Sequence, residues 1–307
     1  MVRLAALAGT LLPCESNPYE SRIMSLVIPS TTISPNARRW RRVRRSRAVW
    51  IGLTIVGAFV LIALLANVIA PHRADERYEK LAPPSATHWL GTDTNQKDVL
   101  SRVIYGSRLS LLAGGLSIVL AIALGVPIGA VAGYCGGAID AWLMRSIDVA
   151  LAFPSILIAL LIASAMEPGW TAVIIAVGLI NVPVFARQIR TTVLTMRDLD
   201  YVVASRAMGA GFWHILTYAL LPGMVGPVIV LATLGLGSAV LEVAGLSFLG
   251  ISGDPTEPEW GTMLRQAKDD LAISLWPALG PGLAISLSIL GFNILGDGLR
   301  DVFDPTK

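Results

Sequence analysis

The sequence predicts an all-α protein that crosses a membrane six times. Of its 307 residues, 54% are hydrophobic and only 15% are charged, and the mean hydropathy is +0.66. A soluble domain carries about 25% charged residues, so most of this chain belongs in lipid. Six apolar segments are long enough to form spans, because a helix needs about 20 residues to cross a hydrocarbon core about 30 Å thick.

Charge distribution predicts the orientation of these spans. Seven arginines lie between Arg38 and Arg47, directly before the first apolar segment. Basic residues that flank a span stay on the cytoplasmic side, so the N-terminus is expected in the cytoplasm, and an even number of spans returns the C-terminus there. We expect residues 1–47 to be a largely disordered cytoplasmic tail and residues 48–307 to form the six-span domain. Membrane topology explains the arginines, so no nucleic-acid partner is expected.

The spans are expected at about 48–70, 109–134, 147–166, 170–185, 223–246 and 275–295. The second is rich in glycine and alanine, which favours close packing against another helix. The fourth is short, and Asn181 and Pro183 near its end predict a distorted or locally unwound helix.

The first external loop, at about 71–108, contains one helical periodicity. Val99, Leu100, Val103 and Ile104 share a face. This pattern fits an interfacial helix before the second span and a plain connector equally well.

The second external loop, at about 247–273, is too long for a bare turn. A short helix is expected at 260–270. The loop is either solvated or a docking surface for an extracytoplasmic partner. Its acidic residues are Asp254, Glu257, Glu259, Asp269 and Asp270.

The residues that usually carry chemistry are sparse. Cys14 and Cys135 imply no disulfide framework. His72, His88 and His214 are scattered without metal-ligand spacing, and we interpret them as surface or interfacial residues. The sequence has no GxxxxGK[ST] loop, so ATP-driven transport requires a separate ATPase chain. No paired ionisable residues converge at membrane depth, and we expect neither a catalytic site nor a bound cofactor or metal.

Glu242 is the exception inside a predicted span. It lies in the outer part of the fifth span, where a buried charge is costly unless it is paired or hydrated. Glu242 either faces a substrate pathway or hydrogen-bonds a neighbouring helix.

The polar stretch at 198–222 predicts two short helices hinged at glycine. Asp198 and Asp200 suit a helix N-terminus, and Gly209 suits a helix C-terminus. Pro222 is well placed in the first turn of the next helix. The second short helix is indicated by apolar residues at i, i+3, i+4 and i+7, namely Phe212, Ile215, Leu216 and Ala219.

This stretch resembles the cytoplasmic coupling loop of ABC importer permeases. The family pattern is Glu-Ala-Ala, three residues, Gly, nine residues and Ile-x-Leu-Pro. Val203, Ala204 and Ser205 take the place of Glu-Ala-Ala here, Gly209 matches, and Leu221-Pro222 closes the motif. The resemblance implies that these six residues couple the chain to an ATPase.

The chain from about Arg39 to Lys307 resembles the C-type permease subunit of bacterial dipeptide and oligopeptide importers. It departs from the family at 95–97, where the family usually has a glycine before a basic residue and Asp. The matching segments are WLGTD at 89–93, GYCGGAIDAWLMRSIDVALAFP at 133–154, LSFLG at 246–250, WG at 260–261 and NILGDGLRDVFDP at 293–305.

The resemblance implies an ABC importer permease fold in the bacterial inner membrane, with both termini in the cytoplasm. It implies a heterodimer with a second permease, two ATPase subunits that bind ATP and magnesium, and an extracytoplasmic substrate-binding protein. The expected cargo is di- and oligopeptides. Related importers carry nickel, glutathione or haem, so these cargoes remain alternatives. A stand-alone secondary transporter or channel is disfavoured by the coupling loop.

Overall fold

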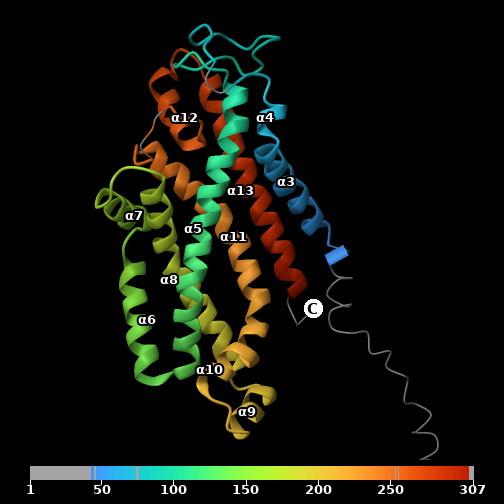
Figure 1. Cartoon of the computed structure of the whole chain (residues 1–307), viewed down its shortest axis with the longest axis vertical. Coiled ribbons are helices and arrows are strands. Elements are labelled where there is room, and N and C mark those ends of the chain that lie inside the picture. The colour runs from blue at the N-terminus through green and yellow to red at the C-terminus, as the bar shows by residue number, and fades with distance from the viewer. Residues whose placement is uncertain (1–42, 45, 74–75, 253, 255, 304–307) are drawn as a thin grey trace, which may run out of the picture. The chain divides into compact units, whose positions relative to one another are not determined.

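The computed structural model describes residues 43–44, 46–73, 76–252, 254 and 256–303 (Figure 1). Within these residues the fold is helical and contains no strand, only an isolated bridge between Thr92 and Asp98. The expected disordered tail at 1–47 falls almost wholly outside the described residues. The helices are α3 (Arg47–Leu64), α4 (Ala66–Ile69), α5 (Val99–Cys135), α6 (Gly137–Ala152), α7 (Ser155–Ser164), α8 (Trp170–Met196), α9 (Asp200–Ala207), α10 (Phe212–His214), the π-helical segment Ile215–Leu220, α11 (Leu221–Phe248), α12 (Trp260–Ala267) and α13 (Trp276–Phe303).

Five described helices are long and apolar enough to cross a membrane, and the bent pair α6–α7 makes a sixth if it counts as one span. The all-α membrane architecture is therefore confirmed. The third span, however, is not one helix over 147–166. Pro154 disfavours helical geometry in the residue before it, and Phe153 is extended (φ −95°, ψ 147°), so α6 and α7 meet at 92°.

Two boundary predictions are wrong. The helix expected in the first external loop is the start of α5, which begins at Val99 after its cap Asp98 and continues through the second span. The predicted distortion of the fourth span is also absent, because α8 runs through Pro183 to Met196. Pro183 is buried, and the Asn181 side chain donates a hydrogen bond to the Val177 carbonyl of the same helix at 2.9 Å. Packing against the neighbouring helices keeps α8 helical despite the missing N–H of the buried Pro183.

Close contact between α5 and α8 forms the centre of the bundle. Gly125, Gly129 and Gly133 recur every fourth residue on α5, and each faces the α8 backbone or its first side-chain atoms. A Cβ added at Gly133 would lie 2.8 Å from the Arg190 carbonyl oxygen. Because these three positions lack side chains, the two helix backbones approach closely, as the glycine-rich sequence predicts.

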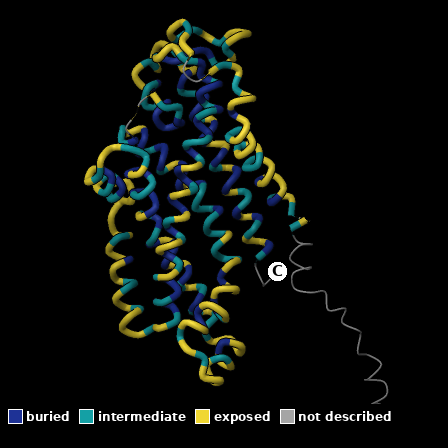
Figure 2. Tube along the Cα trace, viewed as in Figure 1, coloured by how far each residue is buried: buried dark blue, intermediate teal, exposed yellow. Residues whose placement is uncertain are grey.

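Burial differs sharply between the helices (Figure 2). Buried residues concentrate on α5, α8, α11 and α13, whereas α3 buries only Val49 and Gly52 among its residues. Large apolar side chains of α3 and α6, such as Leu64 and Trp142, are exposed. In a membrane protein such a surface faces lipid or another membrane subunit.

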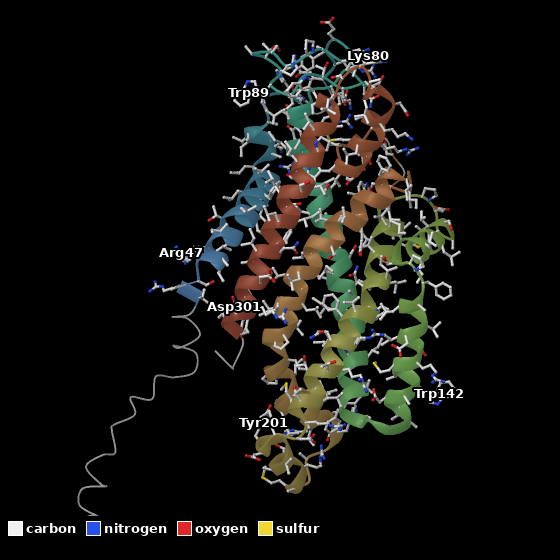
Figure 3. The ribbon with its side chains drawn as sticks, turned by 180° about the vertical axis from the view of Figure 1, so that it is seen from behind. Arg47, Lys80, Trp89, Trp142, Tyr201 and Asp301 are labelled. Carbon is white, nitrogen blue, oxygen red and sulfur yellow. The ribbon has the colours of Figure 1, made fainter. Side chains whose placement is uncertain are left out.

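The two ends of the bundle carry different structures (Figure 1). Residues 71–73, 76–98 and α12 lie at one end, which we call the loop end, and α9 and α10 lie at the other, the coupling end. The start of α3 packs against the end of α13, since a Cβ at Gly298 would meet Val49. Arg47 and Asp301 lie at similar heights, well short of Tyr201 at the coupling end (Figure 3).

Candidate functional site

The coupling loop at 198–222 begins as predicted. Asp200 occupies the first turn of α9, and Arg206 lies in its last turn. Gly209 follows with φ +81°, a left-handed conformation that glycine adopts without the penalty of a Cβ. The helix–glycine arrangement therefore exists, although Val203 stands where the family has Glu.

The second half of the loop is helical, and Pro222 lies in the first turn of α11, as predicted. The prediction missed that the two helices are continuous, because Phe212–Phe248 is one helical rod that includes α10, the π-helical segment and α11. The π-helical segment ends at Leu220, two residues before Pro222. Pro222 has no N–H to donate to the preceding turn, and the wider π-helical turn lets the helix continue past it without a break.

A buried apolar cluster anchors the loop to the bundle. Phe212 packs at its edge, with its ring centroid 5.5 Å from that of Tyr134 on α5, and the Arg206 guanidinium lies 5.5 Å from the same Tyr134 ring centroid. The anchored face therefore matches the predicted apolar periodicity. The buried members are Ala130, Ile189, Val193, Val202, Ile215, Leu216, Leu220 and Met224.

The opposite surface of the loop is open. Of the residues predicted to couple to an ATPase, Val203, Ala204, Gly209, Leu221 and Pro222 are exposed, and Ser205 is half-buried with its hydroxyl donating to the Tyr201 carbonyl. The neighbouring side chains of Met208, Trp213 and Tyr218 are 81%, 69% and 74% exposed. An apolar surface of this kind, at the extremity of the molecule, is typical of a protein contact.

Glu242 hydrogen-bonds a neighbouring helix, which was one of its two expected roles. The Asn181 amide on α8 donates to Glu242 Oε2 on α11 at 2.7 Å. The Glu242 side chain also remains partly exposed, so its other expected role, a position on the substrate pathway, stays a prediction.

A cavity of about 390 Å³ lies between α8, α11 and α13. On α11, Leu231 precedes Glu242 by 11 residues, close to three helical turns, and on α8, Gln188 and Thr192 follow Asn181 by 7 and 11 residues, close to two and three turns. The Glu242–Asn181 pair thus continues the helix faces that line the cavity. The lining residues are Gln188, Thr192, Pro227, Val230, Leu231, Leu234, Arg300 and Phe303.

The second external loop contains the predicted short helix, α12, but its acidic residues do not form a uniform solvated rim. Glu259 is fully buried and caps α12 by accepting from the N–H groups of Gly261 and Thr262. Burial raises the pKa of Glu259, and hydrogen bonds from Gly261, Thr262 and Ser110 oppose that shift. Glu257 accepts a hydrogen bond from the Trp170 indole. Of the five acidic residues, Asp254 and Asp269 are exposed.

Sequence reasoning also missed a buried ion pair at the loop end. Arg102 on α5 is fully buried and pairs with Asp93, and its guanidinium also donates to Gln266 Oε1 at 3.0 Å. These contacts tie the two external loops to α5. Asp93 belongs to the WLGTD segment, so that motif was the available signal.

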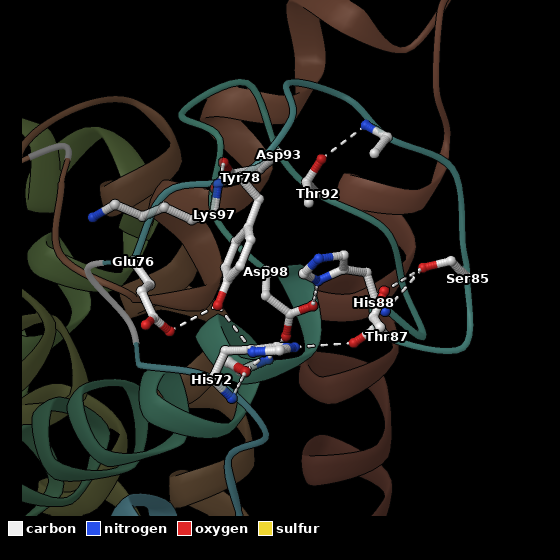
Figure 4. Close-up of polar contacts among 12 residues, drawn as sticks. His72, Glu76, Tyr78, Ser85, Thr87, His88, Thr92, Asp93, Lys97 and Asp98 are labelled. Atoms are coloured by element: carbon white, nitrogen blue, oxygen red, sulfur yellow. Dashed lines mark hydrogen bonds and ion pairs between the residues drawn. The ribbon is translucent and has the colours of Figure 1, made fainter.

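The histidines are not all scattered. His72 and His88 lie together at the loop end, with ring centroids 4.9 Å apart, beside the cap residue Asp98 (Figure 4). Their sixteen-residue separation in an irregular loop gave no recognisable spacing.

Two family models match the chain. The model described as binding-protein-dependent transport system inner membrane component matches residues 125–307, more than half of the chain. The chain belongs to this family. A second model, the N-terminal transmembrane domain of oligopeptide transport permease C, matches residues 34–84.

Relatives of this permease cover nearly its full length. A dipeptide transport system permease protein of Alkalihalophilus pseudofirmus is 39% identical over 90% of this chain and 91% of the relative. A glutathione transport system permease protein of Pectobacterium atrosepticum is 40% identical over 87% and 89%. The structure of the MetNI methionine ABC transporter has a TM-score of 0.55 at 17% identity, covering 66% of this chain and 96% of that one.

These matches confirm the resemblance seen in the sequence and the ABC permease fold. The protein is a multi-pass inner-membrane transport permease, and as an ABC importer component it works with an ATPase and other subunits.

Proposed function

We propose that this permease forms half of an importer pathway for short peptides and that the loop at 198–222 transmits ATPase movement to it. The observation that carries the coupling role is the two-sided construction of this loop. One face is fixed in the apolar cluster with Val202, and the other exposes Ala204, together with Met208 one turn later. An exposed apolar surface that is anchored to the bundle can contact a partner subunit and pass its movement on to the helices.

The remaining assembly follows the family resemblance. The second permease is a similar chain, two ATPase subunits bind ATP and magnesium at the coupling end, and a substrate-binding protein docks at the loop end. This chain itself holds no nucleotide or other cofactor. The coupling end is cytoplasmic, as are both termini. The arginines before α3 support this orientation, as does the packing of the start of α3 against the end of α13.

The pathway includes the face of α8 and α11 that carries Asn181 and Glu242. The cavity below this pair supports that assignment, because its walls combine apolar residues with Gln188 and Thr192. Such mixed lining suits a solute that has both peptide groups and side chains.

Ala204→Asp tests the coupling role. The substitution adds bulk and a charge that must lose water at the ATPase contact, where overpacking alone costs about 1–3 kcal/mol. We expect uptake into vesicles by the complete importer to fall at least tenfold, with fewer ATPase subunits recovered on purification. The matched control is Ala272→Asp, because Ala272 is also exposed but lies at the loop end. Equal uptake by both variants at equal membrane abundance would contradict the assignment.

Peptide cargo is supported by the dipeptide permease relatives, and glutathione is the second candidate because glutathione permeases match equally well. Uptake of a labelled dipeptide, challenged with an excess of either unlabelled dipeptide or glutathione, separates the two. Competition by dipeptides alone supports the proposal. Transport of glutathione without transport of dipeptides would replace the proposed cargo.

A further inference from the structure

A compact group of nitrogen and oxygen ligands lies at the loop end, outside the proposed pathway (Figure 4). His72, His88 and Asp98 each direct a ligand atom into one small region, and these atoms all lie within 4.8 Å of one another. The three residues come from the segment after α4, from the loop and from the cap of α5. Two imidazoles and one carboxylate are a common protein ligand set for Zn²⁺ and leave a fourth position for water.

The carboxylate of this group is held in place. Asp98 Oδ2 accepts hydrogen bonds from the Ser101 N–H at 2.8 Å and the Ser101 hydroxyl at 2.7 Å. Asp98 Oδ1 faces His88 Nδ1 at 3.0 Å, and only 1% of the Asp98 side chain and 14% of the His88 side chain are exposed. Asp98 is therefore a buried anion with one oxygen directed at an imidazole.

A second chain of contacts fixes the proton on His72. The Tyr78 oxygen lies 2.7 Å from Glu76 Oε2 and 2.9 Å from His72 Nδ1. The Tyr78 hydroxyl has one proton, which it donates to the Glu76 carboxylate, so its oxygen accepts from Nδ1–H of His72.

The other nitrogen of His72 then carries the lone pair in the neutral ring. Nε2 lies 3.0 Å from the Thr87 carbonyl oxygen, which can only accept. In the neutral ring, the Nε2 lone pair of His72 faces the lone pairs of the Thr87 carbonyl oxygen, and the two atoms repel each other. Either an added proton on Nε2 or a metal ion bound to Nε2 removes this repulsion. A ligand histidine whose second nitrogen donates to a fixed oxygen is the usual outer arrangement of a metal site.

We propose that His72, His88 and Asp98 bind one divalent metal ion of the zinc class, with Tyr78 and Glu76 orienting His72. The ion fastens the loop at 71–98 to the first turn of α5. Its role is to hold the loop end in one conformation, and it is independent of the cargo.

The test uses the full-length permease purified with its partner subunits through a tag without histidine. Cys135 is exposed and binds Zn²⁺ readily, so both cysteines are first replaced in the background Cys14→Ser/Cys135→Ser. After chelation, Zn²⁺ is titrated while bound metal and thermal unfolding are measured, and Co²⁺ is used as the spectroscopic probe. We expect one high-affinity Zn²⁺ site in this chain and a higher melting temperature when it is filled.

His72→Gln and His88→Gln should each weaken Zn²⁺ binding at least tenfold and abolish the melting shift. Tyr78→Phe keeps the ring but removes the oxygen that accepts from His72, and loss of such an outer contact weakens binding by about 10–100-fold. The control His214→Gln alters an exposed histidine at the coupling end and should bind as the background does. Comparable yield and unfolding of the metal-free variants separates ligand loss from misfolding.

Two results would overturn the proposal. If His72→Gln and His88→Gln still bind one Zn²⁺ per chain with unchanged affinity, the bound metal is an adventitious ion only and the assigned ligands are wrong. Absence of the high-affinity site in the cysteine-free background would show that an added proton on His72, and not a metal ion, lies between Nε2 and the Thr87 carbonyl oxygen.

Discussion

Arg102 shows how much one buried side chain holds together at the loop end. Its charge is compensated by Asp93, while its other donors reach the second external loop at Gln266 and the Thr256 carbonyl. Removing one member of a buried pair leaves the other charge without compensation, which typically costs about 3–5 kcal/mol. We expect Arg102→Met to lower the unfolding free energy of the purified complex by this amount, measured by denaturant titration.

The double variant Asp93→Asn/Arg102→Met should be less destabilised than Arg102→Met alone, because no uncompensated carboxylate remains. The control Arg145→Met removes an exposed arginine from α6 and should change stability by less than about 0.5 kcal/mol. Additive losses in the double variant would show that Arg102 acts through packing rather than through its charge.

Gln96 stands where the family usually has glycine, within the segment 95–97 that departs from the family pattern. Its φ is +64°, in the left-handed region where residues other than glycine are disfavoured by about 1–2 kcal/mol. The glycine that the family usually places before the basic residue suits this conformation. The sequence identified the departure, but only the backbone shows why glycine is the ordinary residue there.

At the scale of elements, the glycine row on α5 gives the sharpest test of packing. Gly129→Ala places a methyl group against the Ala186 carbonyl of α8, so the helices must separate, at a cost of about 1–3 kcal/mol. On the same helix, a Cβ at Gly115 meets nothing within 4 Å. Gly115→Ala should therefore be neutral or stabilising by up to about 1 kcal/mol, through helix propensity. Thermal unfolding of both variants checks this, and equal losses would exclude close α5–α8 contact as the cause.

Elements were predictable where the pattern was local and long. The lengths of the apolar segments predicted the spans. The 3.6-residue period predicted the helix face that packs against the bundle, with Phe212, Ile215 and Leu216. Boundaries failed where tertiary packing decides: Pro183 remains within α8, whereas Pro154 separates α6 from α7. The same residue type has opposite outcomes because Pro183 is buried among neighbouring helices and Pro154 is exposed. The His72–His88 pair was missed because its members are distant in sequence, and the burial of Glu259 was missed because it depends on packing beside Ser110 of α5, although its capping partners Gly261 and Thr262 are local.

At the scale of the whole molecule, the orientation across the membrane is the main remaining prediction. Thr256 lies exposed at the loop end and Met208 at the coupling end. In a cysteine-free background, a cysteine at Thr256 should react with an impermeant reagent in intact cells after the outer barrier is opened. A cysteine at Met208 should react only when the inner membrane is permeabilised. The reverse pattern would invert the orientation and separate the loop at 198–222 from any cytoplasmic ATPase.

The continuity of the rod from Phe212 to Phe248 gives the molecule a lever. With 37 residues, the rod is about 55 Å long at a rise of about 1.5 Å per residue. Pivoted near its coupling end, a tilt of about 5° displaces the far end by about 5 Å on this length. Glu242 lies near that far end, whereas Asn181 belongs to a different helix, α8. A tilt of α11 relative to α8 by this amount would lengthen the 2.7 Å Asn181–Glu242 contact beyond hydrogen-bonding distance, so the presence of that bond distinguishes the two helix arrangements.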